Sequence, residues 1–294
     1  MNNHIDTYLQ YLTHQNRTSK NTRMAYISDI RQFEQYLRKQ YNKPLIEATK
    51  TMVLTYMLAM QKDMKLASTV SRNLSSIKSF YQYLENKGII VKNPATQIHG
   101  PKIDHKTPDY FTVREVNLLL SQPDISTPKG LRDKGMLELM YATGLKVSEL
   151  IQLKVKDYSK VMETLTIVSG KQSRRVPLSD CALNHLNLYL EQGRSHYLKD
   201  KLEDTLFLNN LGKPLTRQGF WKILKQYAVL ANIEKPITPQ SIRNSFVVHL
   251  LENGVDMATI QSLFGQESIQ ILQKISTIHQ TNTFETIKKR HPRK

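Results

Sequence analysis

The chain has 294 residues, of which 42 are lysine or arginine and 25 are aspartate or glutamate, so its formal net charge is +17. This length allows two domains with separate cores. Both parts of the chain are basic, because residues 1–100 hold 14 basic and 6 acidic residues and residues 101–294 hold 28 and 19. This distribution favours a polyanionic partner held from two sides, and a soluble protein with a solvated basic surface is the alternative.

The sequence excludes several classes of protein. No apolar run approaches the roughly 20 residues of a membrane-spanning helix, and residues 1–15 alternate apolar and polar side chains, unlike a secretory signal. Cys181 is the only cysteine, so no internal disulfide can form, which is usual in a reducing cytoplasm. The nine histidines show no His-x-x-x-His spacing. We therefore expect no metal, no other cofactor, no membrane and no small-molecule substrate.

Apolar residues at helical spacing predict four helices in the first hundred residues. In the second of them, Tyr26, Ile30, Phe33 and Leu37 recur at intervals of four and three residues. Together the helices predict an all-α N-terminal domain over residues 1–98. Their expected ranges are 5–12, from Thr18 or Ser19 to Leu37, 51–61, and from Ser68 to Gly88.

Basic side chains lie outside the apolar stripes of these helices. Arg23 lies off the stripe of the second helix, and Arg72 and Lys78 fall on the polar side of the fourth. Basic residues on outer helix faces are solvated in most proteins, and they contact phosphate groups where DNA is the partner. We expect the second role for these three residues.

A linker and a second domain follow. Residues 99–108 contain two prolines and mostly polar neighbours, which is the composition of a linker. The second domain is predicted over residues 109–294, and it begins with a capping box from Thr112 to Glu115 that indicates a helix start.

The second domain is predicted to be mostly helical with one β-hairpin. Residues 162–168 and 174–178 carry alternating β-branched side chains and are separated by Gly170 and polar neighbours, as in two paired strands. The expected fold class is therefore mainly α, with an all-α N-terminal domain and a mixed α+β C-terminal domain. Helices are expected at about 130–142, 147–153, 180–192, 216–231, 239–253, 256–263 and 268–275.

The helix at 239–253 has clear start and stop signals. Pro239 suits a first turn, and Gly254 stands where a left-handed residue commonly ends a helix. Ile242, Phe246 and His249 recur at helical spacing between them. On spacing alone this is an amphipathic helix that packs on a core.

The amino-acid sequence of this helix and of the residues after it resembles box II of the tyrosine recombinase (phage integrase) family. In that family a His-x-x-Arg sequence binds the scissile DNA phosphate, and a Leu-Gly-His follows further along the chain. The resemblance places the arginine at Arg243, and it places glutamines, Gln240 and Gln266, at the two histidine positions. These amides can donate hydrogen bonds to a phosphate but cannot move a proton near neutral pH.

The resemblance extends to the first hundred residues. The stretches NTRMAYISDIRQFEQYL and RNLSSIKSFYQYLENKGIIVKNPATQI are similar to the core-binding domain of Xer-type recombinases, which clasps one side of duplex DNA. Duplex DNA is therefore the partner that the resemblance implies.

Three further segments of the second domain resemble the family. The sequence YATGLKVSEL matches box I, where an arginine that binds the phosphate follows Gly-Leu; here Lys146 stands there and lacks the planar fork of an arginine. Lys171, in the predicted hairpin, matches a lysine that protonates the leaving hydroxyl, and Arg174 beside it is expected to contact DNA. Arg217 is expected to contact a phosphate at the start of the helix from 216, and Trp221 to lie in the core.

The position of the family's nucleophilic tyrosine holds Ile275. Isoleucine has no nucleophilic atom, and no tyrosine follows Tyr227 in the chain. The residues matched to the active site therefore predict a phosphate-binding pocket without strand-transfer chemistry, and a chain that is not an enzyme.

The resulting hypothesis is a non-catalytic, sequence-specific DNA-binding protein, acting as a transcriptional regulator or repressor of a phage or other mobile element. Its expected location is the bacterial cytoplasm, with the nucleoid. The alternatives are an accessory or architectural subunit of a recombination complex, an active recombinase with an unusual nucleophile, and a basic helical protein unrelated to DNA. Self-association through the segment after Ile275 is a further expectation.

Overall fold

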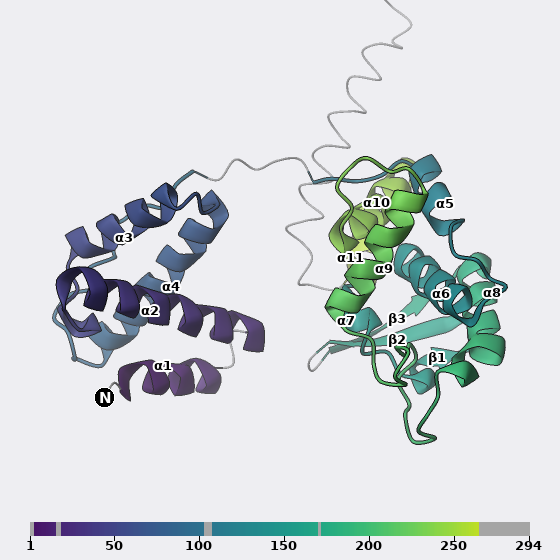
Figure 1. Cartoon of the computed structure of the whole chain (residues 1–294), viewed down its shortest axis with the longest axis horizontal. Coiled ribbons are helices and arrows are strands. Elements are labelled where there is room, and N and C mark those ends of the chain that lie inside the picture. Colours follow the sequence, from purple (N-terminus) through teal and green to yellow (C-terminus); the bar gives the residue numbers. More distant parts are fainter. Residues whose placement is uncertain (1–2, 16–18, 103–107, 170–171, 265–294) are drawn as a thin grey trace, which may run out of the picture. The chain divides into compact units, whose positions relative to one another are not determined.

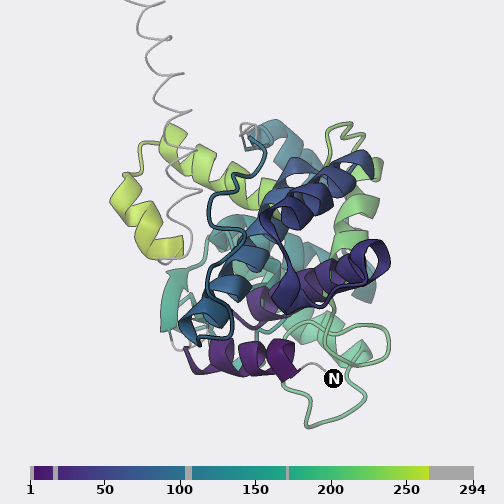
Figure 2. The ribbon, with the colours of Figure 1, turned by 90° about the vertical axis from the view of Figure 1, so that its left-hand side faces the viewer.

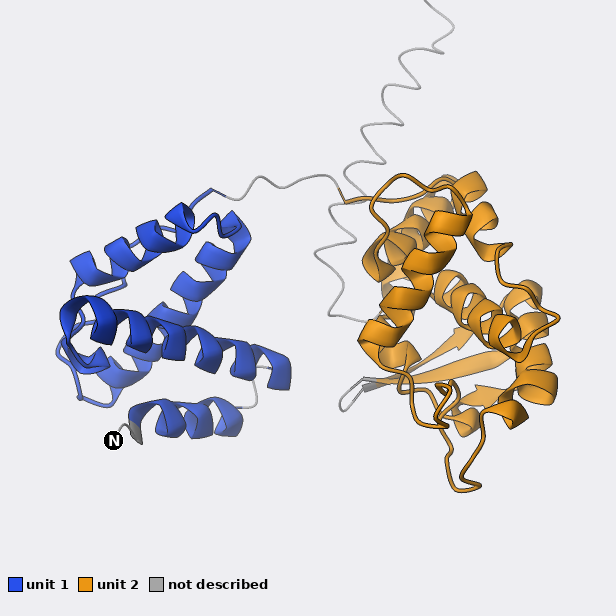
Figure 3. Ribbon diagram, in the orientation of Figure 1, with its two compact units in different colours: residues 1–105 blue, residues 106–294 orange. Residues whose placement is uncertain are grey.

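The computed structural model describes residues 3–15, 19–102, 108–169 and 172–264. The chain divides into two compact units, Met1–His105 and Lys106–Lys294 (Figure 3). The expected mainly helical fold class is confirmed, because both units consist largely of helices and a small antiparallel sheet occurs in the second. Within the described ranges, no helix is both long and apolar enough to cross a membrane.

Unit 1 is built around its longest helix (Figures 1 and 2). Helix α2 contacts α1, α3 and α4, and the side chains of Ile30, Phe33 and Leu37 on it are fully buried. The apolar stripe predicted for this helix is therefore the core stripe. The helices are α1 (Asn3–His14), α2 (Lys20–Tyr41), α3 (Lys50–Lys62) and α4 (Ala67–Asn86), with a short 3-10 helix, η1 (Leu45–Glu47), that the sequence did not predict.

Unit 2 is built around α6 (Pro128–Thr143). Eleven of its sixteen residues are buried, and it contacts α5, α7, α8 and α10. The helix starts where Thr127 accepts a hydrogen bond from the Gly130 amide, and it ends at Gly144, which has a left-handed backbone. The surrounding helices are α5 (Val113–Leu120), α7 (Val147–Leu150), α8 (Asp180–Leu188), α9 (Arg217–Leu230), α10 (Pro239–Glu252) and α11 (Met257–Phe264).

The sheet of unit 2 has three antiparallel strands in the order β1-β2-β3. Strands β2 (Thr164–Ser169) and β3 (Gln172–Pro177) form the predicted hairpin, with Leu165 opposite Val176. The two-residue strand β1 (Tyr158–Ser159) was not predicted, because it is too short to show alternation. The sheet matters for the site because β3 carries Arg174.

The expected helix signals agree with the structure at several positions. Thr112 and Glu115 form the capping box, since the Glu115 amide donates to Thr112 Oγ1 (3.2 Å) and Glu115 Oε2 accepts from the Thr112 amide (2.7 Å). Thr238 caps α10, Pro239 is its first residue, and Gly254 has a φ of 83° just after it. The expected helix at 268–275 lies outside the described residues.

Three expectations for unit 2 need correction. The helix expected at 147–153 ends at Leu150. The helix expected at 180–192 ends at Leu188, and the chain continues as a π-helical turn (Tyr189–Gly193) and a 3-10 turn (Arg194–His196). Trp221 is 44% exposed rather than buried, because the core side of α9 is formed by Phe220, Ile223 and Leu224. The ammonium of Lys225 lies 4.2 Å from the centre of the Trp221 ring.

A buried ion cluster anchors α6 to α9 and to the chain near Leu208. Asp133 is fully buried and accepts from Arg132 Nε (2.9 Å), Lys129 Nζ (2.9 Å) and the Tyr227 hydroxyl (3.0 Å). Arg132 is also buried and donates to the Leu208 carbonyl (3.0 Å). Two opposite charges are therefore buried together, and neither is stable there without the other.

We expect Asp133→Ala to lower the free energy of unfolding of unit 2 by about 3–5 kcal/mol, because it leaves the Arg132 charge buried without a counter-charge. Urea unfolding followed by the fluorescence of Trp221, the only tryptophan and a residue of unit 2, measures this change. The control is Asp204→Ala, which removes the exposed ion pair with Lys154 and should change stability little. Equal losses in both variants would show that the buried charge of Asp133 is not what stabilises unit 2.

Candidate nucleic-acid interface

A buried carboxylate lies at the centre of the candidate site in unit 2. The side chain of Glu149, on the short helix α7, is 5% exposed. Its oxygens accept from Arg174 Nη1 (2.9 Å) and Nη2 (3.0 Å), and Oε2 also accepts from the backbone amide of Lys146 (2.8 Å). Arg243 Nη1 lies 3.9 Å from Oε2. Glu149 thus links α7 to β3 and α10, and two guanidinium groups share one carboxylate.

This arrangement determines the ionisation of the carboxyl group. Burial alone raises the pKa of Glu149, but the hydrogen bonds from Arg174 and the Lys146 amide and the positive charges of Arg174 and Arg243 outweigh it, so that the pKa lies below its ordinary value. Glu149 is therefore ionised at neutral pH. With two guanidinium groups around one carboxylate, a net positive charge remains at the site.

Arg243 is buried in the protein, with Gly144, Phe264 and Glu149 among its neighbours. It is 3% exposed, its Nη1 donates to the carbonyl oxygen of Gly144, and its guanidinium lies 4.3 Å from the centre of the Phe264 ring. Burial lowers the pKa of Arg243 to about 10, against the opposing effect of Glu149, so the group stays charged at neutral pH. The structure thus places the predicted phosphate-binding arginine beneath an aromatic ring.

Gly144 makes this packing possible. Its φ is 58°, and a Cβ atom added there would lie 2.4 Å from Cζ of Phe264 and 2.8 Å from Cδ1 of Phe246. The two phenylalanine rings stack with centroids 5.8 Å apart. Only glycine therefore combines the left-handed turn after α6 with space for the ring that covers Arg243.

Lys146 and Gln240 lie on the outer side of this site. Lys146 is partly exposed and immediately precedes α7, two residues after Gly144. Gln240 is exposed near the start of α10, and its amide donates to Asn244 Oδ1 (2.9 Å) one turn later. Of the predicted site residues of unit 2, the structure groups Lys146, Arg174 and Arg243 around Glu149, while Gln240 precedes Arg243 by about one helical turn.

The remaining predicted residues of unit 2 fall into two groups. Arg217 is exposed at the first residue of α9, at the N-terminal end where an anion is favoured. Lys171, Gln266 and Ile275 lie outside the described residues.

In unit 1 the predicted basic residues lie on two adjacent helices, α2 and α4. Arg72 is partly engaged, because its Nη1 lies 2.5 Å from Oδ2 of the buried Asp29, which also accepts from Ser76 (2.7 Å). The Arg72 side chain is nevertheless 45% exposed. Arg23 and Lys78 are partly exposed.

Two residues of the site were missed from the sequence. Glu149 was passed over because an acid does not suggest a phosphate site, although an acid three residues after Lys146 is a signal for a helix start. Phe264 reads as an ordinary apolar residue of α11, and nothing in the local sequence indicates its contact with Arg243.

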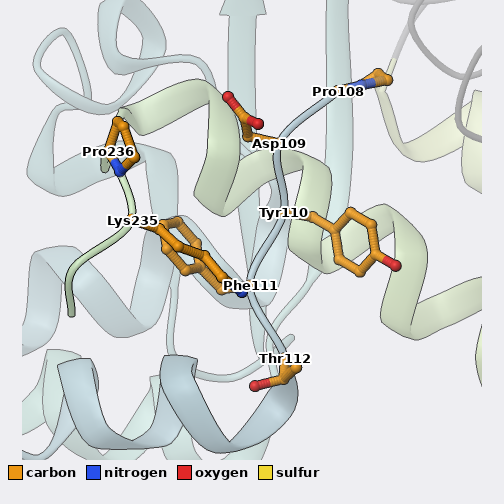
Figure 4. A pocket seen from close by; sticks show the side chains of 7 residues that line it. All are labelled: Pro108, Asp109, Tyr110, Phe111, Thr112, Lys235 and Pro236. Atoms are coloured by element: carbon orange, nitrogen blue, oxygen red, sulfur yellow. The ribbon is translucent and has the colours of Figure 1, made fainter. Parts of the chain in front are cut away.

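A separate hollow of about 360 Å³ lies between residues 108–112 and the loop before α10 (Figure 4). Its charged side chains are Asp109 and Lys235, and Lys235 extends beside Phe111 and pairs with Glu115 (2.8 Å). None of the predicted DNA contacts lines this hollow, and we assign it no binding role.

Comparison with known sequences identifies relatives of the whole chain. Residues 109–280 match the phage integrase family, and residues 5–88 match the family's N-terminal SAM-like domain. The tyrosine recombinase XerD of Staphylococcus haemolyticus is 35% identical over 290 residues, covering 98% of each chain. The tyrosine recombinase XerD of Listeria innocua is 39% identical over 298 residues, covering 100% of each chain.

Solved structures with the same fold include recombinases bound to DNA. The chain is similar to the XerH site-specific recombinase bound to its palindromic difH substrate, with a TM-score of 0.76 and 18% identity over 90% of this chain and 78% of that one. It is also similar to the Tn1549 transposon integrase in complex with circular intermediate DNA, with a TM-score of 0.73 and 18% identity over 92% and 94%. At this identity the likeness concerns the fold.

These relatives overturn the expectation that the chain is not an enzyme. Tyrosine recombinases are enzymes, and the sequence identity of 35–39% to them extends over nearly the whole chain. The expectation depended on single positions, Lys146, Gln240, Gln266 and Ile275, of which the last two lie outside the described residues. It is wrong.

The buried Glu149 gives the site a predictable dependence on pH. Because its pKa is lowered in the folded state, its contribution to stability is complete above the ordinary value of 4.5 and is lost as the pH falls through the folded value. We expect Glu149→Gln to lose about 3–5 kcal/mol at neutral pH, since Arg174 and Arg243 lose their counter-charge. This difference from the unmodified protein should shrink as the pH falls below 4.5.

Urea unfolding followed by Trp221 fluorescence at several pH values checks this expectation. The control is Glu191→Gln, which alters an exposed pair with Lys160 and should leave the stability and its pH dependence nearly unchanged. A difference between Glu149→Gln and the unmodified protein that stays constant down to acidic pH would show that the carboxylate charge is not what matters.

Proposed function

The chain belongs to the phage integrase family of tyrosine recombinases, and we propose that it binds a specific site on duplex DNA and acts in site-specific recombination. The observation that carries the proposal is the cluster of basic groups around Glu149, on the scaffold of a recombinase. The relatives named tyrosine recombinase XerD match this chain over nearly their whole length. The structures of XerH and of the Tn1549 integrase have been solved in complex with DNA.

The electrostatics of the site support phosphate binding. Arg174 and Arg243 carry two positive charges against one on Glu149, and Lys146, whose backbone amide donates to Glu149, adds a third charge to this segment. Lys146 and Gln240 are more exposed than Arg243, so they are more accessible to a phosphate oxygen from solvent. Arg243 lies beneath Phe264, so its direct contact with a phosphate needs a displacement of that ring.

The basic residues of unit 1 are proposed to hold the same duplex. Arg23, Arg72 and Lys78 lie on α2 and α4, and they contact the backbone phosphates rather than base edges in this proposal. Contacts of this kind position a protein on DNA, while sequence preference comes from other side chains.

The earlier hypothesis of a transcriptional regulator has no supporting observation of its own, and recombination takes its place in this proposal. We expect the protein to act on DNA in the bacterial cytoplasm. Self-association through the residues after Ile275 stays a prediction, because those residues lie outside the described part of the chain.

The chemistry of strand cleavage raises one question specific to this chain. The resemblance places Ile275 at the nucleophile position, and an isoleucine side chain cannot attack phosphorus. Cleavage by this chain therefore requires a hydroxyl from another residue or from another molecule in the recombination complex.

DNA binding should depend strongly on salt. If about six phosphates are contacted, the affinity for a duplex selected from a random library should fall by roughly 10³ between about 50 and 200 mM salt. Lys146→Ala and Arg217→Ala should each lower the salt slope by about one and weaken binding to all sequences alike. Fluorescence anisotropy titrations measure both quantities.

Lys160→Ala is the matched control, because Lys160 is exposed and pairs with Glu191 away from the site residues. It should leave the salt slope unchanged. An affinity that does not respond to salt, or equal effects of all three variants, would contradict the proposed interface.

A nicked duplex that carries the selected site tests the reaction. Cleavage traps a covalent protein–DNA adduct, and mass spectrometry of the adduct locates the attacking side chain. We expect the adduct either on a residue of this chain other than 275, when the chain is alone, or on an XerD relative, when one is added. Binding without any adduct or strand exchange under both conditions would limit the function to DNA binding and refute a role in recombination.

A further inference from the structure

Three side chains capable of binding a metal converge between α6 and α8, away from the cluster around Glu149. Glu138 lies on α6, and Cys181 and His185 lie on α8. One potential ligand atom from each residue lies within 4.8 Å of the other two. The two helices pack against each other in unit 2 (Figure 1), so the cluster depends on the core of the domain rather than on a loop.

The sequence spacing explains two of the three ligands. Cys181 and His185 are four residues apart and therefore lie on one face of α8. The Cys181 sulfur lies 3.7 Å from Nδ1 of His185, and Nδ1 lies 2.8 Å from the Cys181 carbonyl oxygen. The pair has the spacing of a His-x-x-x-His motif, but its first member is a cysteine, so the histidines alone do not reveal it.

The third ligand comes from a buried carboxylate. The Glu138 side chain is 7% exposed, and its Oε1 lies 2.8 Å from Nζ of Lys134. A carboxylate oxygen of Glu138 lies within 4.8 Å of a potential ligand atom of both Cys181 and His185.

The distances are close to those of a zinc site. Metal–ligand bonds of about 2.0–2.3 Å in a tetrahedron separate the ligand atoms by roughly 3.3–3.8 Å. The observed limit of 4.8 Å therefore requires a contraction of about 1 Å, which side-chain rotation can supply. A thiolate and a carboxylate also balance the charge of a divalent cation.

An opening is available for a fourth ligand. Glu138 and Cys181 line a hollow of about 530 Å³ that also contains Tyr141 and His249. The Tyr141 hydroxyl and Nδ1 of His249 are 2.7 Å apart, so these two groups bind each other. Water in this hollow can complete the coordination, as in zinc sites with three protein ligands.

We propose that Glu138, Cys181 and His185 form a binding site for Zn²⁺ that joins α6 to α8. The combination of one sulfur, one nitrogen and one oxygen ligand selects zinc over magnesium or calcium, which prefer oxygen alone. Binding displaces the thiol proton to solvent and draws the Glu138 carboxylate away from Lys134. The bound ion links the central helix of unit 2 to its neighbour and makes the stability of this unit depend on zinc.

The single cysteine permits a direct test with tag-free, metal-free protein. Cys181 is exposed and should react with a thiol reagent, and one equivalent of Zn²⁺ should protect it. Co²⁺ should give a sulfur-to-metal charge-transfer band in the near ultraviolet. At a free zinc concentration about one hundred times Kd, the melting temperature of unit 2 should rise by roughly 5–10 °C.

Variants separate this site from incidental binding by exposed histidines. Cys181→Ser, His185→Ala and Glu138→Gln should each weaken zinc binding by about tenfold or more. The control His196→Ala removes an exposed histidine beyond the cluster and should leave the affinity unchanged. Circular dichroism of each metal-free variant verifies that it is folded.

Two results would overturn the proposal. One is zinc binding by Cys181→Ser with unchanged affinity, which would place the ion elsewhere. The other is thiol reactivity of the folded, unmodified protein that zinc does not alter. Because neither measurement uses DNA, failure here is distinguishable from failure of the proposed recombination function.

Discussion

The shared carboxylate of Glu149 is the interaction on which the basic site of unit 2 depends. Three segments distant in the sequence, near residues 146, 174 and 243, converge on its two oxygens. Without a buried negative charge, two guanidinium groups would repel each other at short distance in a medium that screens charge poorly. One buried acid therefore allows two guanidinium groups to lie close together while the site keeps a net positive charge. An anionic ligand requires such a charge.

The central helix α6 supports the charged cluster around Glu149. It is buried on most sides, ends at Gly144, and places the Gly144 carbonyl against Arg243. The same helix carries Asp133 near its start and Glu138 in its second half, so three polar clusters are arranged along one buried element. Buried polar groups of this kind are stable only with matched partners, and the helix is therefore fixed in position as well as in conformation.

Local signals in the sequence were sufficient for the helices but not for the contacts between them. The capping box of Thr112, the proline at the start of α10 and the stripe through Ile30, Phe33 and Leu37 act within a few residues, and the structure has them as predicted. Glu149 and Phe264 act across the chain, and their roles have no local signature. The exposure of Trp221 was mispredicted for a different reason: a large aromatic residue was expected to be buried, although the apolar stripe of α9 runs through Phe220, Ile223 and Leu224.

Burial explains why this chain keeps Arg243. Arg243 binds the Gly144 carbonyl, Phe264 and Glu149, so its loss would leave a buried carbonyl and part of a buried carboxylate without a partner, whatever happens to phosphate binding. Lys146 is partly exposed and Gln240 is exposed, and the described hydrogen bond of the Gln240 side chain stays within α10. An exposed side chain can differ from the family's pattern at a lower cost to folding than a buried one. The matched arginine is therefore evidence for the fold before it is evidence for phosphate binding. The altered residues at positions 146 and 240 are weak evidence against catalysis. For this reason single positions led to the wrong expectation that the chain is not an enzyme, whereas similarity over the whole chain did not.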